Sequence, residues 1–165
     1  MARWGSCDYR QLQKLRDNLT KLESTDLDQF CREVSKELAA RLLALVIPRT
    51  PVGKYPKATG KKGGTLRRGW TARTEQEAVA HDGSNNAKEY AAALPVSKQG
   101  DTYVIEVINP VHYASYVEFG HRTPSGKGWV NGQYFLTLSE KDLERPTPGV
   151  IERKLEALLQ EAFRV

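Results

Sequence analysis

The sequence has little cysteine, histidine and methionine. Its 165 residues include two cysteines, three histidines and one methionine. A disulfide scaffold needs more than two cysteines and an oxidising compartment, and a zinc site needs closely spaced pairs, so we interpret Cys7 and Cys31 as free thiols. The longest apolar run in the first part of the chain is residues 42–47, far short of the roughly 20 residues that span a bilayer. These shortages argue against a disulfide-rich secreted protein, a zinc protein and a membrane protein.

The composition is otherwise that of a globular domain. Hydrophobic residues make up 39%, charged residues 27% and aromatic residues 8% of the chain. The length predicts one domain, and residues 1–8 carry no apolar stretch typical of a secretory signal, so folding in a cytoplasm is expected. Lysine and arginine outnumber aspartate and glutamate by 25 to 20, a mild excess that favours acidic or polyanionic neighbours.

Two helices are predicted at the start of the chain. Leucines at positions 12, 15, 19 and 22 recur at helical spacing, which predicts an amphipathic arm over about residues 8–22. Ser24 and Thr25 then resemble a helix start that supplies a capping hydroxyl. The apolar residues that follow keep the helical period, which predicts a core helix over residues 24–47 that ends at Pro48.

A long loop rich in proline and glycine follows the core helix. Residues 47–73 contain eight basic residues and no acidic one. A compact domain seldom keeps so long a loop unless the loop has a function or takes its shape on a partner. At its end, Leu66, Arg68, Trp70 and Ala72 alternate with more polar residues, which predicts a strand that covers residues 66–73 and ends at some point before Gly83.

The second half of the chain predicts a small sheet between helices. Strands are expected over residues 90–98 and 102–109, joined by a hairpin turn at residues 99–101. A short helix over residues 110–120, a glycine-rich loop over 121–128, an apolar segment over 129–143 and a C-terminal helix over 146–165 complete the chain.

This order of elements predicts the α+β class. We expect a small antiparallel sheet of about three or four strands packed with the long N-terminal core helix, a short helix after the sheet and C-terminal helices. The chain is expected to form one domain with these parts: a helical arm (1–23), the core helix (24–47), the basic loop (48–65), the sheet and short helices (66–145) and the C-terminal helix (146–165).

No motif predicts catalysis. Gly60 and Lys61 suggest a phosphate-binding loop, but the glycine spacing is wrong and no serine or threonine follows the lysines. His81, His112 and His121 are not at ligand spacing, so we interpret them as turn and surface residues. We therefore expect no enzyme activity, no catalytic residue, no cofactor and no metal.

The basic loop leaves a second function open. Its basic residues are interleaved with Tyr55 and Trp70, a pattern that suits contact with phosphates and stacking on bases. The alternative interpretation is therefore a non-specific nucleic-acid-binding module that uses residues 49–73. Trp70, on the apolar face of its predicted strand, fits a core position better than a stacking platform.

Three blocks of sequence together resemble a known family. They are Arg-Thr-Pro-Val-Gly at 49–53 with Thr59-Gly60, Gly-Thr-Leu-Arg-Arg-Gly-Trp at 64–70, and Tyr-Ala-Ser-Tyr-Val-Glu-Phe-Gly-His-Arg-Thr at 113–123 followed by Gly-Trp-Val at 128–130. In this order they resemble the neck and tail-completion family of tailed bacteriophages typified by gene product ten of phage Hong Kong 97. The resemblance runs from about Ile47 to Leu138.

The resemblance implies a structural protein of a phage or a phage-tail-like particle. It implies a homo-oligomeric ring, expected to be hexameric, in the neck between head-closure or portal-side proteins and the tail-terminator or tail-tube proteins. The protein is then a virion component assembled in the cytoplasm of the bacterial host, with no membrane partner. Contact between the basic loop and DNA in the lumen is the alternative to contact with an acidic protein, which we prefer because strong phosphate binding would hinder sliding DNA.

Candidate contact residues follow from this interpretation. We expect charge pairs between subunits at Arg67, Arg68, Glu118 and Arg122. The aromatic residues expected as apolar anchors, each with an interior position in its own chain as the alternative, are Trp70, Tyr113, Tyr116, Phe119 and Trp129. Further partner contacts are expected at Arg49, Lys54, Lys61, Lys62 and His121.

Overall fold

The fold consists of helices and two short β-ribbons. The computed structural model describes residues 10–21, 27–60, 63–80 and 86–163. The elements are α1 (Arg10–Lys21), α2 (Leu27–Arg49), η2 (Lys57–Thr59), α3 (Thr65–Arg68), η3 (Gly69–Thr71), α4 (Glu75–Ala80), α5 (Ala87–Ala93), β1 (Val96–Gln99), β2 (Thr102–Ile105), α6 (Ala114–Phe119), β3 (Gly120–Arg122), β4 (Trp129–Asn131), α7 (Phe135–Glu144) and α8 (Thr147–Ala162). None of the helices in these ranges is long and apolar enough to cross a membrane.

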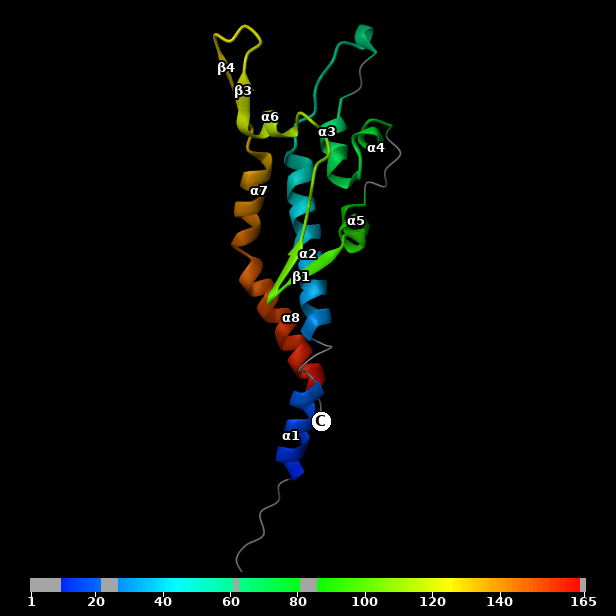
Figure 1. The fold of residues 1–165 in the computed structure, drawn as a ribbon, viewed down its shortest axis with the longest axis vertical. Coiled ribbons are helices and arrows are strands. Elements are labelled where there is room, and N and C mark those ends of the chain that lie inside the picture. Colours follow the sequence, from blue (N-terminus) through cyan, green and yellow to red (C-terminus); the bar gives the residue numbers. More distant parts are fainter. Residues whose placement is uncertain (1–9, 22–26, 61–62, 81–85, 164–165) are drawn as a thin grey trace, which may run out of the picture.

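Helix α2 is the axis of an elongated molecule. α7 runs along one side of it and α5 lies on the other, while α1 extends beyond its lower end (Figure 1). Val34, Ala39, Leu43 and Val46 of α2 are buried at three- to five-residue intervals, as expected for a helix that packs one face on its neighbours. Helix α2 therefore carries most of the interior packing.

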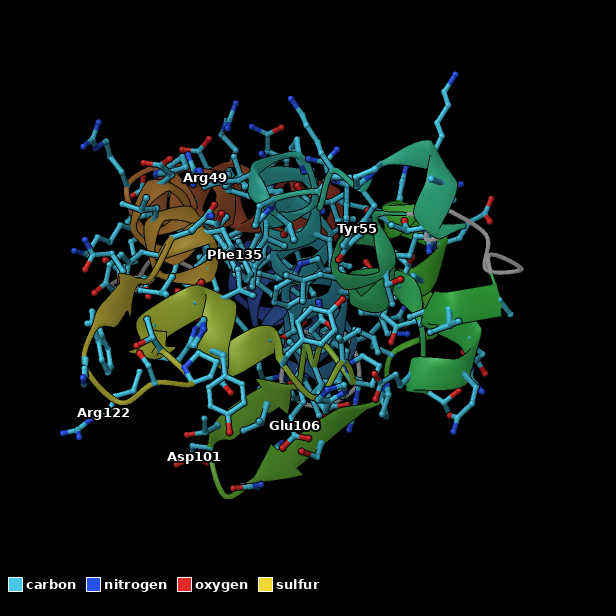
Figure 2. All side chains as sticks on the ribbon, turned by 90° about the horizontal axis from the view of Figure 1, so that it is seen from above. Arg49, Tyr55, Asp101, Glu106, Arg122 and Phe135 are labelled. Carbon is cyan, nitrogen blue, oxygen red and sulfur yellow. The ribbon has the colours of Figure 1, made fainter. Side chains whose placement is uncertain are left out.

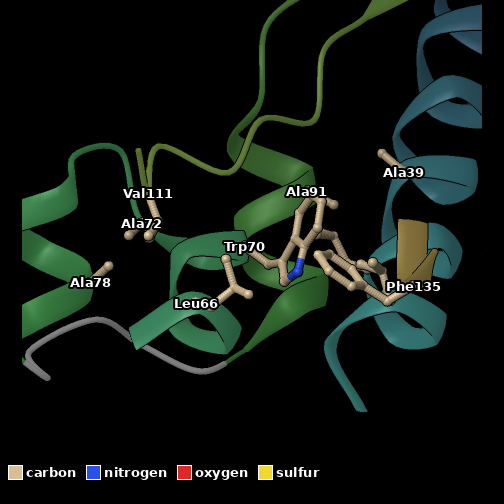
Figure 3. Close-up of a cluster of buried hydrophobic side chains, with 10 residues drawn as sticks. Ala39, Leu66, Trp70, Ala72, Ala78, Ala91, Val111 and Phe135 are labelled. Carbon is tan, nitrogen blue, oxygen red and sulfur yellow. The ribbon is translucent and has the colours of Figure 1, made fainter. Parts of the chain in front are cut away.

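The hydrophobic core gathers around the second half of α2. Trp70 lies between Leu66 and Phe135 (Figure 3). The rings of Trp70 and Phe135 meet edge to face, with centroids 6.2 Å apart. This geometry is favourable for aromatic pairs because a positive ring edge faces a negative ring surface. The core therefore joins α2, α3 with η3, and α7 at one place.

Asp28 anchors the β1–β2 ribbon to the start of α2. Its carboxylate accepts hydrogen bonds from the Tyr103 hydroxyl (2.6 Å) and from Nε of Arg32 (2.7 Å), and Nζ of Lys98 lies 3.5 Å away. These hydrogen bonds, that from Tyr103 first, lower the pKa of Asp28 from 3.8 to about 2. Arg32 also donates to the carbonyl of Val96 in β1, at 2.7 Å. The charged form of Asp28 thus holds helix and ribbon together.

This anchor predicts a pH-dependent stability. Because the folded-state pKa is lowered, ionised Asp28 stabilises the protein above about pH 4, and this contribution is lost as the pH falls toward about 2. We expect Asp28→Asn to reduce the free energy of unfolding in urea at pH 7, and the difference from wild type to shrink below about pH 4. Asp101→Asn, at the exposed ribbon turn, is the control. A wild-type to Asp28→Asn difference that stays constant from pH 7 to pH 2.5 would contradict the prediction.

The α+β class predicted from the sequence is confirmed. The long helix at residues 27–49 matches the predicted core helix, although it continues through Pro48 to Arg49. The proposed caps at Ser24 and Thr25 and the thiol of Cys7 lie outside the described residues, whereas Cys31 is a free cysteine. The strands form two separate antiparallel ribbons, β1 with β2 and β3 with β4, rather than one sheet.

The strand predicted over residues 66–73 is wrong. Residues 65–71 form α3 and η3, introduced by Gly64 in the left-handed conformation (φ 97°). Leu66, Gly69 and Trp70 are buried, and their spacing of three and four residues is helical. The same segment therefore fits both the alternation expected of a strand and the spacing expected of a helix, and the predicted strand rested on the alternation alone.

The strand predicted over residues 90–98 is correct only at its end. Residues 87–93 form α5, whose first amides at Lys88 and Glu89 donate to the Asn86 side chain at 3.2 and 3.3 Å. Asparagine is a strong N-cap and alanine the best helix former, so the local sequence favours a helix here. Only residues 96–99 form the strand, which pairs with residues 102–105 across the predicted turn.

The remaining predictions agree in type and differ in extent. The predicted strand over 102–109 stops at Ile105, and the predicted short helix begins at Ala114. Residues 121–128, predicted as a loop, contribute to β3 and to the turn of the β3–β4 ribbon. The C-terminal helix is α8, at residues 147–162.

Candidate functional site

Two segments project from the same end of the molecule. They are the loop, described at residues 50–60 and 63–64, and the β3–β4 ribbon at residues 120–131, with α6 between their bases (Figure 1). We call this part the distal end. The two projecting segments contain six basic residues and no acidic one. The other residues contain nineteen basic and twenty acidic residues, so the excess positive charge of the chain lies in the projecting segments.

Thr50 fixes the point where the projecting loop leaves α2. The residue is completely buried, and its hydroxyl donates to the carbonyl of Val46 (2.7 Å) and accepts from Nε1 of Trp70 (2.8 Å). The guanidinium of Arg67 donates to the carbonyl of Thr50 at 2.7 Å and to that of Pro48 at 3.1 Å. Carbonyls at a helix C-terminus lack partners within the helix, and a cation is favourable there. Arg67 therefore caps α2.

Arg68 fixes the point where the loop returns to the body at α3. Its guanidinium donates to the carbonyls of Ala78 (2.8 Å) and Gly63 (3.2 Å) and to the hydroxyl of Thr65 (3.3 Å). Five arginine N–H groups in a planar fork suit such simultaneous contacts with backbone oxygens. The loop thus leaves and re-enters the body at two points, each tied by an arginine.

Glu118 joins α6 to the start of α7. Although buried, its carboxylate accepts from the amide of Leu136 (2.9 Å) and from the amide and hydroxyl of Thr137 (3.0 and 2.8 Å). These amides belong to the first turn of α7, where N–H groups lack helical partners and a negative charge is stabilised. Because the carboxylate of Glu118 is buried and hydrogen-bonded within its own chain, it is not available to a partner at the surface of the distal end.

Two glycines allow the β3–β4 ribbon to cross α6 closely. Gly120 has φ 89°, and a Cβ there would overlap the carbonyl of Val130. A Cβ at Gly132 would overlap the backbone of Glu118 and Phe119. The ribbon therefore rests on backbone contacts that tolerate no side chain at either position.

We expect Gly132→Ala to destabilise the protein by about 1–3 kcal/mol, because backbone must shift to admit the methyl group. Gly149→Ala in α8 is the control, since its Cβ would meet nothing within 4 Å. Thermal unfolding of both variants measures the difference. Equal stability of the two variants would contradict the close crossing.

An apolar patch covers the ribbon and the adjoining helices. Its members are large hydrophobic side chains that remain exposed, with Trp129 at 59%, Phe119 at 58% and Tyr116 at 57%. We use the term apolar patch for the exposed side chains of Tyr116 and Phe119 on α6, Trp129 and Val130 on β4, and Tyr134 and Leu138 at the start of α7; as neighbours in a strand, Trp129 and Val130 lie on opposite faces of the ribbon. Exposed apolar side chains gathered in one region usually mark an interaction surface. Tyr134 also adopts a left-handed backbone conformation (φ 51°), a strain that is typical of functional sites.

The loop carries a pocket at its base. A pocket of about 300 Å³ lies between residues 51–55 and 63–66 of the loop and Tyr113, Val117 and Gln133. Burial raises the pKa of the Tyr113 hydroxyl above its ordinary value. Val52 and Tyr55, which line this pocket, are also exposed apolar residues. The loop thus adds apolar surface to the distal end.

The predicted contact residues divide into two groups. Arg49 is held by α7, donating to Ser139 (3.0 Å) and Asp142 (2.6 Å), and Arg67, Arg68, Trp70 and Glu118 are likewise engaged within the chain. The exposed group consists of Lys54, Tyr116, Phe119, Arg122 and Trp129. Viewed onto the distal end, Arg122 points outward at the rim (Figure 2). Tyr113 and His121 are half-buried, and Lys61 and Lys62 lie outside the described residues.

The histidines are not gathered at one place. Nδ1 of His112 lies 2.7 Å from Oε1 of Glu75, and the His121 ring lies edge to face with Tyr116. His81 is outside the described residues. Within the part of the chain that the structure describes, no group of three or more histidine, cysteine or acidic residues is arranged to hold a metal ion.

The comparison with family models decides the affiliation of the chain. A family described as "Bacteriophage HK97-gp10, putative tail-component" matches residues 13–120, about two thirds of the chain. The chain belongs to this HK97-gp10-like family. The match confirms the resemblance and contains α2, the projecting loop and α6. No curated protein and no solved structure matches the chain.

Within this HK97-gp10-like chain, sequence reasoning missed several residues of the distal end. Val130, Tyr134 and Leu138 of the apolar patch were absent from the predicted contacts, as was the buried Thr50. Tyr134 and Leu138 are four residues apart around the start of α7, a spacing that places them on one helical face. That spacing was the available signal for two of the missed patch residues.

Proposed function

We propose that this protein is a non-enzymatic structural subunit of a phage or phage-tail-like particle. In this proposal it forms a ring in the neck that joins the head and portal side to the tail. Membership of a tail-component family supports a structural role in a virion and contacts with other virion proteins. The observation that carries the proposal is the set of exposed apolar side chains on and beside a projecting ribbon, because exposed apolar side chains gathered in one region usually mark a contact with another protein.

The two projections support the proposal of a ring. In a ring, each subunit presents one surface to its neighbour and receives a different one, and the contact repeats by rotation until it closes. The β3–β4 ribbon and the loop at 50–64 are two different projections that can act as such a pair. We propose a sixfold ring with Tyr116, Phe119 and Trp129 as apolar anchors. Particles then take up the ring in the host cytoplasm.

The basic residues indicate the partner above or below the ring. Lys54, Lys57, Arg122 and Lys127 are exposed and make no ion pair among the described residues. A basic end without local acidic residues favours an acidic surface, because unlike charges raise the rate and specificity of docking. We propose acidic surfaces of the adjacent head-closure or tail-tube proteins as this partner.

The test of the proposal combines imaging and mass measurement. We expect the purified protein to form closed rings in electron micrographs and one dominant oligomer in native mass spectrometry. Phe119→Asp with Trp129→Asp places two charges in the patch, so we expect a monomer that keeps the wild-type circular dichroism spectrum. Val79→Asp is the control, since Val79 is 60% exposed on α4, away from the patch. A monomeric wild type, or rings formed by the double variant, would contradict the proposal.

A second candidate function is non-specific nucleic-acid binding by the distal end. The six basic residues of the two projecting segments, together with the exposed Tyr55, favour it. A mobility shift with random-sequence duplex DNA at two salt concentrations distinguishes the candidates. Micromolar binding that collapses at higher salt would support DNA contact, whereas absent binding leaves the acidic protein partner.

A further inference from the structure

Helix α1 stands apart from the body of the molecule. It extends beyond the lower end of α2 and shares no extensive packing with another described element (Figure 1). Leucines at positions 12, 15 and 19 nevertheless occupy one face by their spacing, and Leu19 is 48% exposed. Helices this short are marginal in water unless an apolar face is packed. α1 is therefore a helix with an amphipathic sequence whose Leu19 has no surface to cover it.

A groove of suitable kind lies between α2 and α8. It has a volume of about 490 Å³ and is lined by Gln29, Phe30, Glu33 and Val34 of α2 and by Lys154, Ala157, Leu158 and Glu161 of α8. The lining residues of α8 span eight positions, about 12 Å of helix, which is room for two turns of a third helix. Leu155 and Leu159, also on α8, are exposed as well. Phe30, Val34, Ala157 and Leu158 therefore form the apolar part of the groove, beside its polar and charged residues.

The groove is acidic because its one lysine is already paired. Nζ of Lys154 lies 2.6 Å from Oε2 of Glu37, and the hydrogen bonds from Lys154 and Arg41 hold the pKa of Glu37 below its ordinary value. Glu33 accepts only from the neutral amide of Gln29, at 2.8 Å, and Glu161 has no ion pair among the described residues. The two glutamates thus face a ligand with uncompensated negative charge.

The charge of α1 is opposite to that of the groove. Its twelve residues include four basic residues and one acidic residue. Arg16, whose guanidinium forms an exposed pair with the adjacent Asp17 at 2.9 Å, stands four residues after Leu12 and three before Leu19, so it borders the leucine face, whereas Lys14 stands at no such spacing. A second groove, between α2 and α5, has a volume of about 550 Å³ but is bordered by Lys36, Arg41 and Lys88 against Glu37 alone. Charge therefore favours the α2–α8 groove over the α2–α5 groove.

We propose that α1 of one subunit docks into the α2–α8 groove of a neighbouring copy. The leucine face covers Phe30, Val34 and Leu158, and Arg16 meets Glu33 and Glu161. The inference rests on the proposed ring, to which it adds a second, chain-exchanging contact at the end opposite the apolar patch. Exchange of an identical element between protomers is a common route to oligomers.

Disulfide trapping between two single-cysteine variants tests the exchange. In a chain with Cys7 and Cys31 replaced by serine, Leu19→Cys and Leu158→Cys are prepared separately, checked for folding by circular dichroism and mixed under mild oxidation. We expect a mixed disulfide-linked dimer. Mixing Leu19→Cys with Ala92→Cys, in the α2–α5 groove, is the control and should give none. An absent Leu19–Leu158 dimer, or equal dimer from both mixtures, would overturn the inference.

Charge reversal provides a second readout. We expect Arg16→Glu to reduce the mixed dimer severalfold, Glu33→Lys on the partner to restore it, and Lys14→Glu to leave it unchanged. Closure within single molecules of the double variant, without mixed dimers, would overturn the inference because the arm then covers its own groove. Flotation with phosphatidylglycerol vesicles that depends on α1 would overturn it in favour of a lipid surface.

The outcome is separable from that of the proposed function. Native mass spectrometry of the same samples, under reducing conditions, reports the ring independently of the disulfide. Rings without trapped dimers would refute arm exchange and leave the ring proposal standing. Subunits that neither assemble nor form the mixed dimer would refute both.

Discussion

Trp70→Ala is expected to be the most destabilising single substitution discussed here. Trp70 is almost completely buried, meets Phe135 edge to face and donates its indole N–H to Thr50 at 2.8 Å. Truncation removes this packing and leaves a cavity, which typically costs about 3–5 kcal/mol. It also leaves the Thr50 hydroxyl without its donor at the point where the projecting loop leaves α2.

Urea unfolding at neutral pH measures this effect. Trp129→Ala is the matched control, because it removes the same side chain from an exposed position. We expect the control to change the free energy of unfolding by less than about 0.5 kcal/mol, as for most surface substitutions. Similar losses of the free energy of unfolding for Trp70→Ala and Trp129→Ala would contradict the placement of Trp70 in the interior and Trp129 on the surface.

Glu118→Ala is expected to have the second largest effect. The substitution removes the acceptor of two amides and one hydroxyl at the start of α7, and Glu118 itself is only 3% exposed. Donors left without a partner in a buried place cost about 1–3 kcal/mol each when they stay dry, and loss of a cap alone costs about 1 kcal/mol. We therefore expect a loss of roughly 2–4 kcal/mol in the free energy of unfolding.

Two further variants serve as comparisons for Glu118→Ala. Glu118→Gln keeps one acceptor oxygen and is expected to lose less stability than Glu118→Ala. Glu140→Ala removes a carboxylate from an exposed position of the same helix and should be close to neutral. If Glu118→Ala is as stable as Glu140→Ala in chemical denaturation, the carboxylate does not hold α7 as the structure indicates.

The sequence predicted those elements whose signal is local and repeated. Apolar residues at helical spacing located α2 and α8, and the glycine turn at residue 100 located the β1–β2 ribbon. The segment at 65–71 failed because a seven-residue stretch satisfies both the two-residue and the helical period. Its buried positions are decided by α2, and short-range periodicity contains no information on that contact.

The predicted partner contacts at Lys54, Arg122 and Trp129 stay predictions. These three residues are exposed, in segments without acidic residues, so they are available for such contacts. Arg67 and Arg68 were expected to pair with other subunits, yet their guanidinium groups are engaged with backbone carbonyls of their own chain. The sequence shows that both residues are charged, but only the fold brings the backbone carbonyls that they bind close to their side chains. Substituting them would therefore disturb folding together with assembly.

Hydroxyl-radical footprinting tests the central claim most directly. It compares the oxidation of Tyr116, Phe119 and Trp129 in the isolated subunit and in assembled particles. We predict that these three side chains are protected on assembly, whereas Val79 and Ile108, which are equally exposed on other parts of the chain, remain reactive. Unchanged oxidation of all three patch residues in particles would contradict the assignment of the distal end as the assembly surface.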